Sequence, residues 1–145
     1  MAKRVRKTLV IPNETRYLAA MREAVAQVVQ SSDFPNEDMH RVVLAVDEAV
    51  ANIMEHALAR EEDSGELTIR MALDVNATQF QVTIQDSGKP FDPEEIEAPD
   101  IREQVAAGRR DGLGVFLIRQ IMDEVRYSFV QGLRNELHMA KYVHA

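Results

Sequence analysis

The feature that most constrains the fold is the segment 42–59, VVLAVDEAVANIMEHALA, which predicts one long amphipathic helix. When the segment is placed on a wheel at about 100° per residue, its apolar side chains share a broad face and its polar side chains form a narrow strip. We expect the broad face to pack on a core and the strip to face either water or a polar ligand. The broad face collects Val42, Val43, Val46, Ala49, Val50, Ile53, Met54 and Ala57, and the strip collects Arg41, Glu48, Asn52, Glu55 and His56.

Two residues of the strip, Glu48 and Asn52, are the first candidate functional pair. They are four positions apart, so their side chains point the same way. Asparagine is a poor residue for a helix interior because its amide competes for backbone hydrogen bonds. A strip that only faces water would be expected to hold a better helix former, such as Glu, Lys or Gln. A carboxylate can take a proton and an amide oxygen can reach a hard cation. Simple exposure to water remains the alternative if this helix is considered alone.

Length and composition predict a single domain, residues 1–145, in an acidic chain with a net charge of −7. That charge argues against nucleic-acid binding, and the basic residues among the first seven are expected to decorate an edge strand. No apolar run is long enough to span a membrane, and the N-terminus lacks the apolar region of a secretory signal. We therefore expect no membrane partner and a cytoplasmic location.

The remaining elements follow from hydrophobic periodicity. Asn13 is expected to cap the first helix, and Pro35 to lie in the first turn of the central helix. The order β-α-α-β-β-α-β-β predicts an α+β two-layer sandwich, with a mixed, mostly antiparallel sheet and three helices on one face. The predicted elements are strands at 4–11, 66–75, 78–86, 125–131 and 135–143, helices from about 14 to 30, 42 to about 61 and 112 to 124, and a long loop at 89–110 with a short helix near 101–107. A turn at Asn76-Ala77 is expected to join the second and third strands into a hairpin, and a turn at Gly132-Leu133-Arg134 to join the last two strands into another.

Asp86 is the second candidate because it continues the inward parity of Phe80, Val82 and Ile84, and an inward carboxylate needs a partner. The alternative is a carboxylate that opens the turn into Ser87-Gly88.

The third candidate is the glycine pair of Gly112-Leu113-Gly114, which leads directly into an apolar helix. Backbone N–H groups at the start of a helix bind phosphate well, and glycine allows a close approach. The pair alone is a weak signal because many helices follow a glycine.

Taken in order, these motifs resemble the N, G1 and G2 boxes of the Bergerat-fold (GHKL) ATPases. The motifs are Glu48-x-x-x-Asn52, Asp86-x-Gly88 and Gly112-x-Gly114, with a long loop before the last. Within that superfamily, the segments DEAVANIMEHA, DSGKPFDPEEI, GLGVFLIRQIMDEVRY and NELHMAKYV resemble the anti-sigma-factor serine/threonine kinases of the RsbW type. The resemblance covers nearly the whole chain.

The resemblance implies a role for each matching position. Gly88 would give backbone support beside Asp86, the loop 89–110 would be the ATP lid, and His56 is expected to be structural. Arg109 and Arg110 would add charge against the phosphates, although a solvated basic pair is the alternative for at least one of them. In the other positions, Glu48 matches the general base, Asn52 the Mg²⁺ ligand, Asp86 the carboxylate that reads the adenine amino group, and Gly112, Leu113 and Gly114 the phosphate loop.

The resemblance also implies the function and the partners. It implies an ATP- and Mg²⁺-dependent serine/threonine kinase that is also an anti-sigma factor, forms a homodimer, and phosphorylates an antagonist of that anti-sigma activity. The alternatives are an ATP-regulated module that sequesters a partner with little or no turnover, and an ATP-binding structural domain. One departure is Pro90, which stands where many relatives have a second glycine in the G1 box. A sensor histidine kinase is not expected because no histidine lies in a dimerising phosphoacceptor region.

Overall fold

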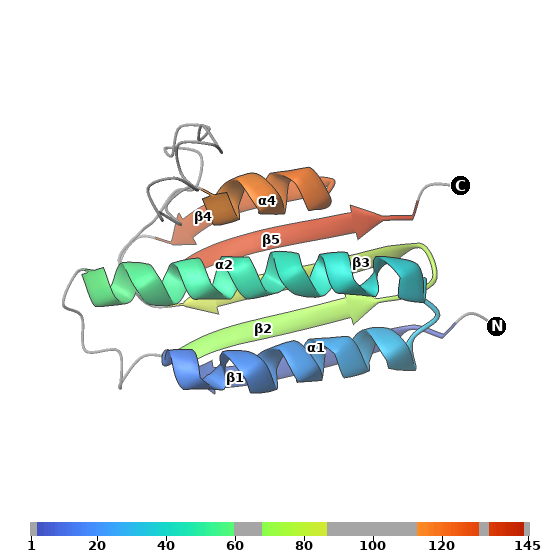
Figure 1. Cartoon of the computed structure of the whole chain (residues 1–145), viewed down its shortest axis with the longest axis horizontal. Helices are drawn as coiled ribbons and strands as arrows, with labels where there is room; N and C mark the ends of the chain where they lie inside the picture. Colours follow the sequence, from blue (N-terminus) through green and yellow to red (C-terminus); the bar gives the residue numbers. More distant parts are fainter. Residues whose placement is uncertain (1–2, 60–67, 87–112, 131–133, 144–145) are drawn as a thin grey trace.

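The computed structural model describes residues 3–59, 68–86, 113–130 and 134–143, which form two layers (Figure 1). In these residues, helices α1, α2 and α4 lie together on one face of a five-stranded sheet. The predicted α+β class is therefore confirmed. The helices are α1 (Leu18–Ser31), α2 (Met39–Ala59) and α4 (Leu113–Ile121), with short 3-10 turns at Thr15–Tyr17 and Asn36–Asp38, and the strands are β1 (Val5–Pro12), β2 (Thr68–Val75), β3 (Gln79–Asp86), β4 (Glu124–Val130) and β5 (Arg134–Tyr142).

The strands lie in the order β1-β2-β3-β5-β4, and each of the four described pairings is antiparallel. The sequence predicted a mixed sheet, mostly antiparallel, so the described strands are more regular than expected. Both predicted hairpins form, β2 with β3 and β4 with β5. The hairpins join through β3 and β5, and this pairing places Asp86 directly opposite Asn135.

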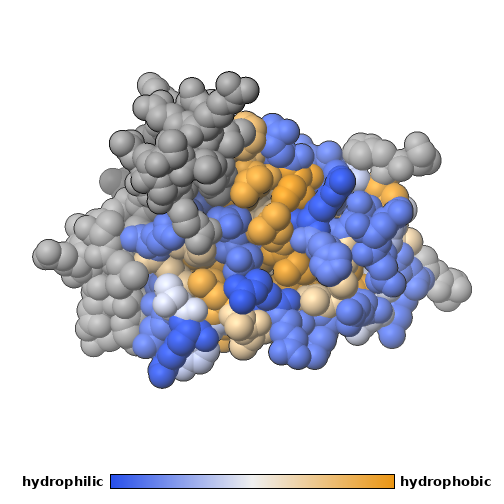
Figure 2. Space-filling model, viewed as in Figure 1, coloured by the Kyte–Doolittle hydropathy of each residue, from blue (hydrophilic) through white to orange (hydrophobic). Residues whose placement is uncertain are grey.

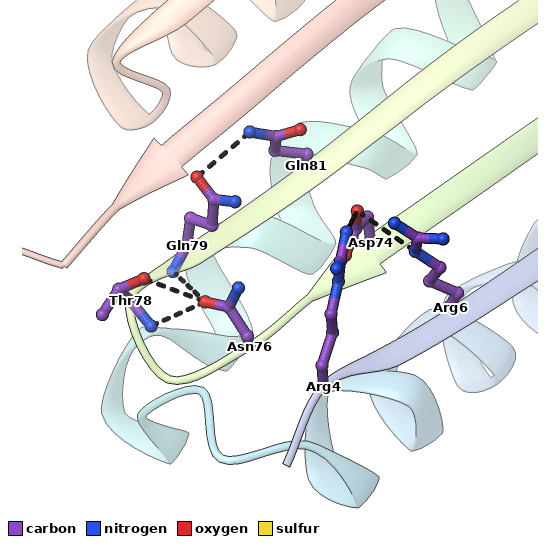
Figure 3. Close-up of polar contacts among 7 residues, drawn as sticks. All are labelled: Arg4, Arg6, Asp74, Asn76, Thr78, Gln79 and Gln81. Atoms are coloured by element: carbon purple, nitrogen blue, oxygen red, sulfur yellow. Dashed lines mark hydrogen bonds and ion pairs between the residues drawn. The ribbon is translucent and has the colours of Figure 1, made fainter. Parts of the chain in front are cut away.

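The turn between β2 and β3 is fixed by the side chain of Asn76 (Figure 3). Its Oδ1 accepts hydrogen bonds from the backbone N–H of Thr78 at 2.9 Å, the Thr78 hydroxyl at 2.9 Å and the backbone N–H of Gln79 at 3.0 Å. Asparagine suits such turns because its short side chain replaces a backbone acceptor. The predicted turn at Asn76 is confirmed, and it sets the register that carries β3 to its end at Asp86.

The core lies between the two layers. Inward residues of the strands alternate with exposed or half-buried ones, as the period of two requires, and the predicted inward set of β3 is fully buried. The ring of Phe34, which precedes α2, meets that of Phe80 at a centroid distance of 6.1 Å. Fully buried side chains of the core include Val42, Val46, Val50, Ile69, Met71, Phe80, Val82, Ile84 and Met139.

Two expected helix starts are wrong. Asn13 does not cap α1, because the chain turns at Glu14, whose N–H bonds to the Pro12 carbonyl, and α1 begins only at Leu18. Asn13 is instead 4% exposed, and its Oδ1 has no hydrogen-bond partner among the described residues. Pro35 does not lie in the first turn of α2 because its ψ of 126° is extended, and the turn Asn36–Asp38 separates it from the helix.

Strand β1 forms one edge of the sheet, as expected for the basic N-terminal segment. Arg4, just before β1, donates two hydrogen bonds to Asp74 of β2, from Nε at 2.8 Å and Nη2 at 2.6 Å (Figure 3). Arg6 lies 3.6 Å from the same carboxylate. Charged side chains at a sheet edge discourage pairing with another chain. No helix in the described part of the chain is long and apolar enough to cross a membrane.

Candidate functional site

Asp86 is the last residue of β3 and the one charged member of its inward row in the described strand. It is 8% exposed, and its Oδ1 accepts a hydrogen bond of 3.0 Å from Nδ2 of Asn135. A buried carboxylate is costly unless hydrogen bonds compensate its charge. The predicted inward orientation is confirmed, and the structure supplies the partner that the sequence could not name.

Asn135 was not predicted as a site residue. It lies at the start of β5 on the same parity as Leu137 and Met139, and it is only 2% exposed. A polar residue on the apolar parity of a strand is a signal that the sequence does contain. The pairing of β5 with β3 is needed to show that this residue faces Asp86, because the two lie 49 positions apart.

Glu48 and Asn52 lie on one flank of α2. Glu48 is 9% exposed and Asn52 is half-buried, whereas Arg41 and Glu55 are exposed, so the polar strip is buried in its middle. The side chain of His56 lies outside the described residues.

Packing on both sides of α2 explains this burial. Helix α2 contacts α1 and α4, which lie along its two flanks (Figure 1). Asp47 marks the α1 flank because its carboxylate lies 3.0 Å from Nη1 of Arg22. Glu48 and Asn52 lie about 100° and 140° further round the helix, which places them on the flank toward α4.

The predicted phosphate loop lies partly within the described residues. Leu113 is the first residue of α4 and Gly114 is the second, while Gly88, Arg109, Arg110, Gly112 and the lid 89–110 lie outside the described residues. Helix α4 packs on the core through the buried side chains of Val115 and Ile118, and Met122, directly after the helix, is buried as well. The first N–H groups of a helix have no partner within the helix, so they can meet an anion.

The elements that carry these groups meet at one end of the molecule. The end of β3, the C-terminal half of α2 and the start of α4 lie together there (Figure 1), and α2 contacts both of the other elements. The face that the helices present is largely hydrophilic, with hydrophobic residues gathered around α4 and α2 (Figure 2). The arrangement therefore combines a buried acceptor, an amide oxygen and the start of a helix at one end of the fold.

The chemistry of these three groups fits a nucleotide bound with a magnesium ion. A carboxylate accepts hydrogen bonds from an exocyclic amine, and the start of a helix favours phosphate. Among the described residues no three His, Cys, Asp or Glu side chains gather as a metal site. Magnesium commonly takes one or two protein ligands and completes its shell with phosphate oxygens and water, so Asn52 suits that role.

Two cavities lined by described residues lie elsewhere, along the strands. One, of about 370 Å³, is lined by residues of β1, β2 and β3 that include Thr8, Ala72 and Thr83. The other, of about 540 Å³, is lined by residues of β4 and β5 that include Arg126 and His138. Neither is lined by a predicted site residue. The segments 60–67 and 87–112, which follow α2 and β3 in the sequence, lie outside the described residues.

Comparisons with known proteins support the family that the sequence motifs resemble. The chain is 31% identical over 140 residues to the serine-protein kinase RsbW of Listeria monocytogenes, covering 94% of this chain and 86% of that protein. It is 30% identical over 137 residues to the protein of the same name from Bacillus mycoides, covering 92% and 82%. A chain in the crystal structure of the SiaB–SiaC complex from Pseudomonas aeruginosa shares the fold, with a TM-score of 0.69 and 15% identity over 92% of this chain and 88% of that one. The model of the histidine kinase-like ATPase domain matches residues 11–141, and the chain therefore belongs to that family, as a relative of the RsbW-type serine-protein kinases.

Proposed function

We propose that this protein is an ATP-dependent serine/threonine kinase and anti-sigma factor that phosphorylates an antagonist protein in a partner-switching module. The observation that carries the proposal is the buried Asp86 carboxylate, which accepts a hydrogen bond from Asn135 at the end of β3. The names of the RsbW relatives support the choice of serine kinase. The cytoplasmic location expected from the sequence and the homodimer implied by the resemblance belong to the same proposal.

Three groups would hold the nucleotide. Asp86 accepts a hydrogen bond from the 6-amino group of adenine, which guanine lacks at that position. Asn52 offers its amide oxygen to Mg²⁺, and the N–H groups at the start of α4 face the phosphates. A chain with a net charge of −7 needs such positive elements to accept a polyanion.

Glu48 would serve the chemistry. Bound MgATP supplies the γ-phosphoryl group and the metal charge that stabilises it. One carboxylate oxygen of Glu48 takes the proton from the hydroxyl of the serine or threonine that attacks. Phosphoryl transfer depends mainly on positioning and charge, so few protein groups are needed.

The burial of Glu48 favours one second candidate function. Glu48 is 9% exposed, so the hydroxyl of a folded protein partner has less access to its carboxylate than a small nucleotide would have, as expected of a module that binds a partner under ATP control with little turnover. Both candidates share the nucleotide site and differ only in phosphotransfer.

A phosphotransfer assay distinguishes the two. The purified protein is incubated with γ-labelled ATP, Mg²⁺ and the product of a neighbouring antagonist-like gene, and proteins retained from the native cytosol are identified in ATP and in ADP. The kinase proposal expects labelled serine or threonine on the antagonist and a sigma factor retained in a nucleotide-dependent way. Nucleotide-dependent retention without label favours the binding module, and the absence of both results contradicts the proposal.

A further inference from the structure

We propose that Asn135 is the residue that positions Asp86 and thereby sets the preference for adenine. The inference rests on the proposed function, because it takes Asp86 as the group that meets the base. It assigns a role in nucleotide specificity to Asn135 of β5, whereas Asp86 lies on β3, and it adds no chemical step.

The geometry supports a positioning role. Asn135 and Asp86 are directly opposite in the register of β5 and β3, and both are nearly inaccessible, at 2% and 8% exposed. Nδ2 of Asn135 donates to Oδ1 of Asp86 at 3.0 Å, within the usual range for a hydrogen bond of this kind. The two oxygens of a carboxylate together offer about four acceptor sites, so this bond leaves capacity for further donors.

The chemistry explains why such a bond would matter for specificity. An ionised carboxylate only accepts hydrogen bonds, so it matches an amine and opposes the carbonyl oxygen that guanine presents there. A neutral amide donor favours the ionised form and fixes the rotation of the carboxylate plane. Without the amide, Asp86 loses one hydrogen bond that fixes the plane of its carboxylate, and this loss weakens its match to adenine.

The same pair of strands provides a matched control. Gln85 and Glu136 are the neighbouring register pair, and Nε2 of Gln85 donates to Oε2 of Glu136 at 3.0 Å. Because adjacent residues of a strand point to opposite faces, this bond lies on the face of the sheet away from Asp86. The Gln85→Leu variant removes a β3–β5 side-chain bond of equal length and leaves the buried pair intact.

The test compares two nucleotides in three proteins by calorimetry with Mg²⁺. The nucleotides are ATP and purine riboside triphosphate, which lacks only the 6-amino group. The Asn135→Leu variant keeps a similar volume but has no donor. We expect it to lose about tenfold to a hundredfold in ATP affinity, the size expected for a hydrogen bond to a charged group, and to keep its affinity for the purine analogue. Gln85→Leu should match the wild type with both nucleotides.

The outcomes separate this inference from the proposed function. An equal loss for both nucleotides in Asn135→Leu means a structural role only, and an unchanged preference for ATP means that Asn135 does not position Asp86; either result overturns the inference alone. A wild type that binds both nucleotides equally overturns the adenine site and the inference together. Asn135→Ala, which also lacks a donor, carries the same expectation if the leucine variant does not fold by circular dichroism.

Discussion

The Asp86→Asn substitution separates the effect of the buried charge on folding stability from its effect on ATP binding. The amide has the same shape, and its oxygen can accept the hydrogen bond that Asn135 donates to Asp86 at 3.0 Å. Its NH₂ group then points toward the place of the adenine amine, so two donors face each other. The variant should fold as well as the wild type or better, because a buried charge has been removed, and it should bind ATP poorly.

The size of the effect follows from the bond that is lost. A hydrogen bond to a charged group contributes about 1.5–3 kcal/mol, which corresponds to roughly 10- to 150-fold in the dissociation constant. At an ATP concentration about 100-fold above the wild-type dissociation constant, binding stabilises the wild type by about 2.7 kcal/mol. If the constant rises about a hundredfold, the stabilisation falls to about 0.4 kcal/mol.

Thermal unfolding with and without MgATP measures both consequences. For a chain of this size, ATP should raise the melting temperature of the wild type by roughly 8–10 °C, and that of Asp86→Asn by about 1–2 °C. The melting temperature without nucleotide should be equal or higher in the variant. An equal rise with ATP in both proteins would refute the assignment of Asp86, and a large drop without nucleotide would refute the argument about its buried charge.

Three further predictions concern other residues. Glu48→Gln should retain ATP affinity but slow phosphotransfer to the antagonist by about 10²–10⁴, as measured by initial rates, and a wild-type rate would remove the base role. Burial, and then the Arg126 cation, lowers the pKa of His138 below its ordinary value of 6.5. The unfolded chain therefore binds this proton at a higher pH than the folded chain, and the unfolding free energy should fall as the pH drops from 6.5 toward the lower folded pKa. Urea titrations at several pH values should show that the unfolding free energy depends less on pH in His138→Gln than in the wild type. An unchanged pH dependence would count against this linkage. The hydrogen bond from Arg4 holds the pKa of the Asp74 carboxyl below its ordinary 3.8, so the stability that it adds is present above pH 3.8 and lost as the pH falls through the lower folded value. Because the pair is partly exposed, Asp74→Asn should cost at most about 1 kcal/mol near pH 7, and a much larger loss in urea titrations would contradict the view of a surface pair.

The elements that the sequence predicted best are those with a regular pattern. The alternation of Phe80, Val82 and Ile84 in β3 and the apolar face of α2 were correct because period two and period 3.6 place side chains before any tertiary contact is known. The inward position of Asp86 followed from the same alternation.

Features that depend on packing between distant segments were not predictable. The bond of Asn135 to Asp86 requires the pairing of β5 with β3, which no local pattern reveals. Glu48 is buried on the flank of α2 toward α4, and the contact between these two helices could not be read from the wheel, which shows only a polar strip. The start of α1 was misplaced because Asn13 has the chemistry of a cap but lies in a turn that precedes the helix.

The most direct measurement is calorimetric titration of the wild-type protein with MgATP and with MgGTP. The account predicts one nucleotide site per chain and an affinity for ATP at least about tenfold higher than for GTP, because Asp86 accepts from the adenine amine and opposes the guanine carbonyl. Equal affinities, or no binding of ATP, would contradict the claim that β3, α2 and α4 together form an adenine nucleotide site.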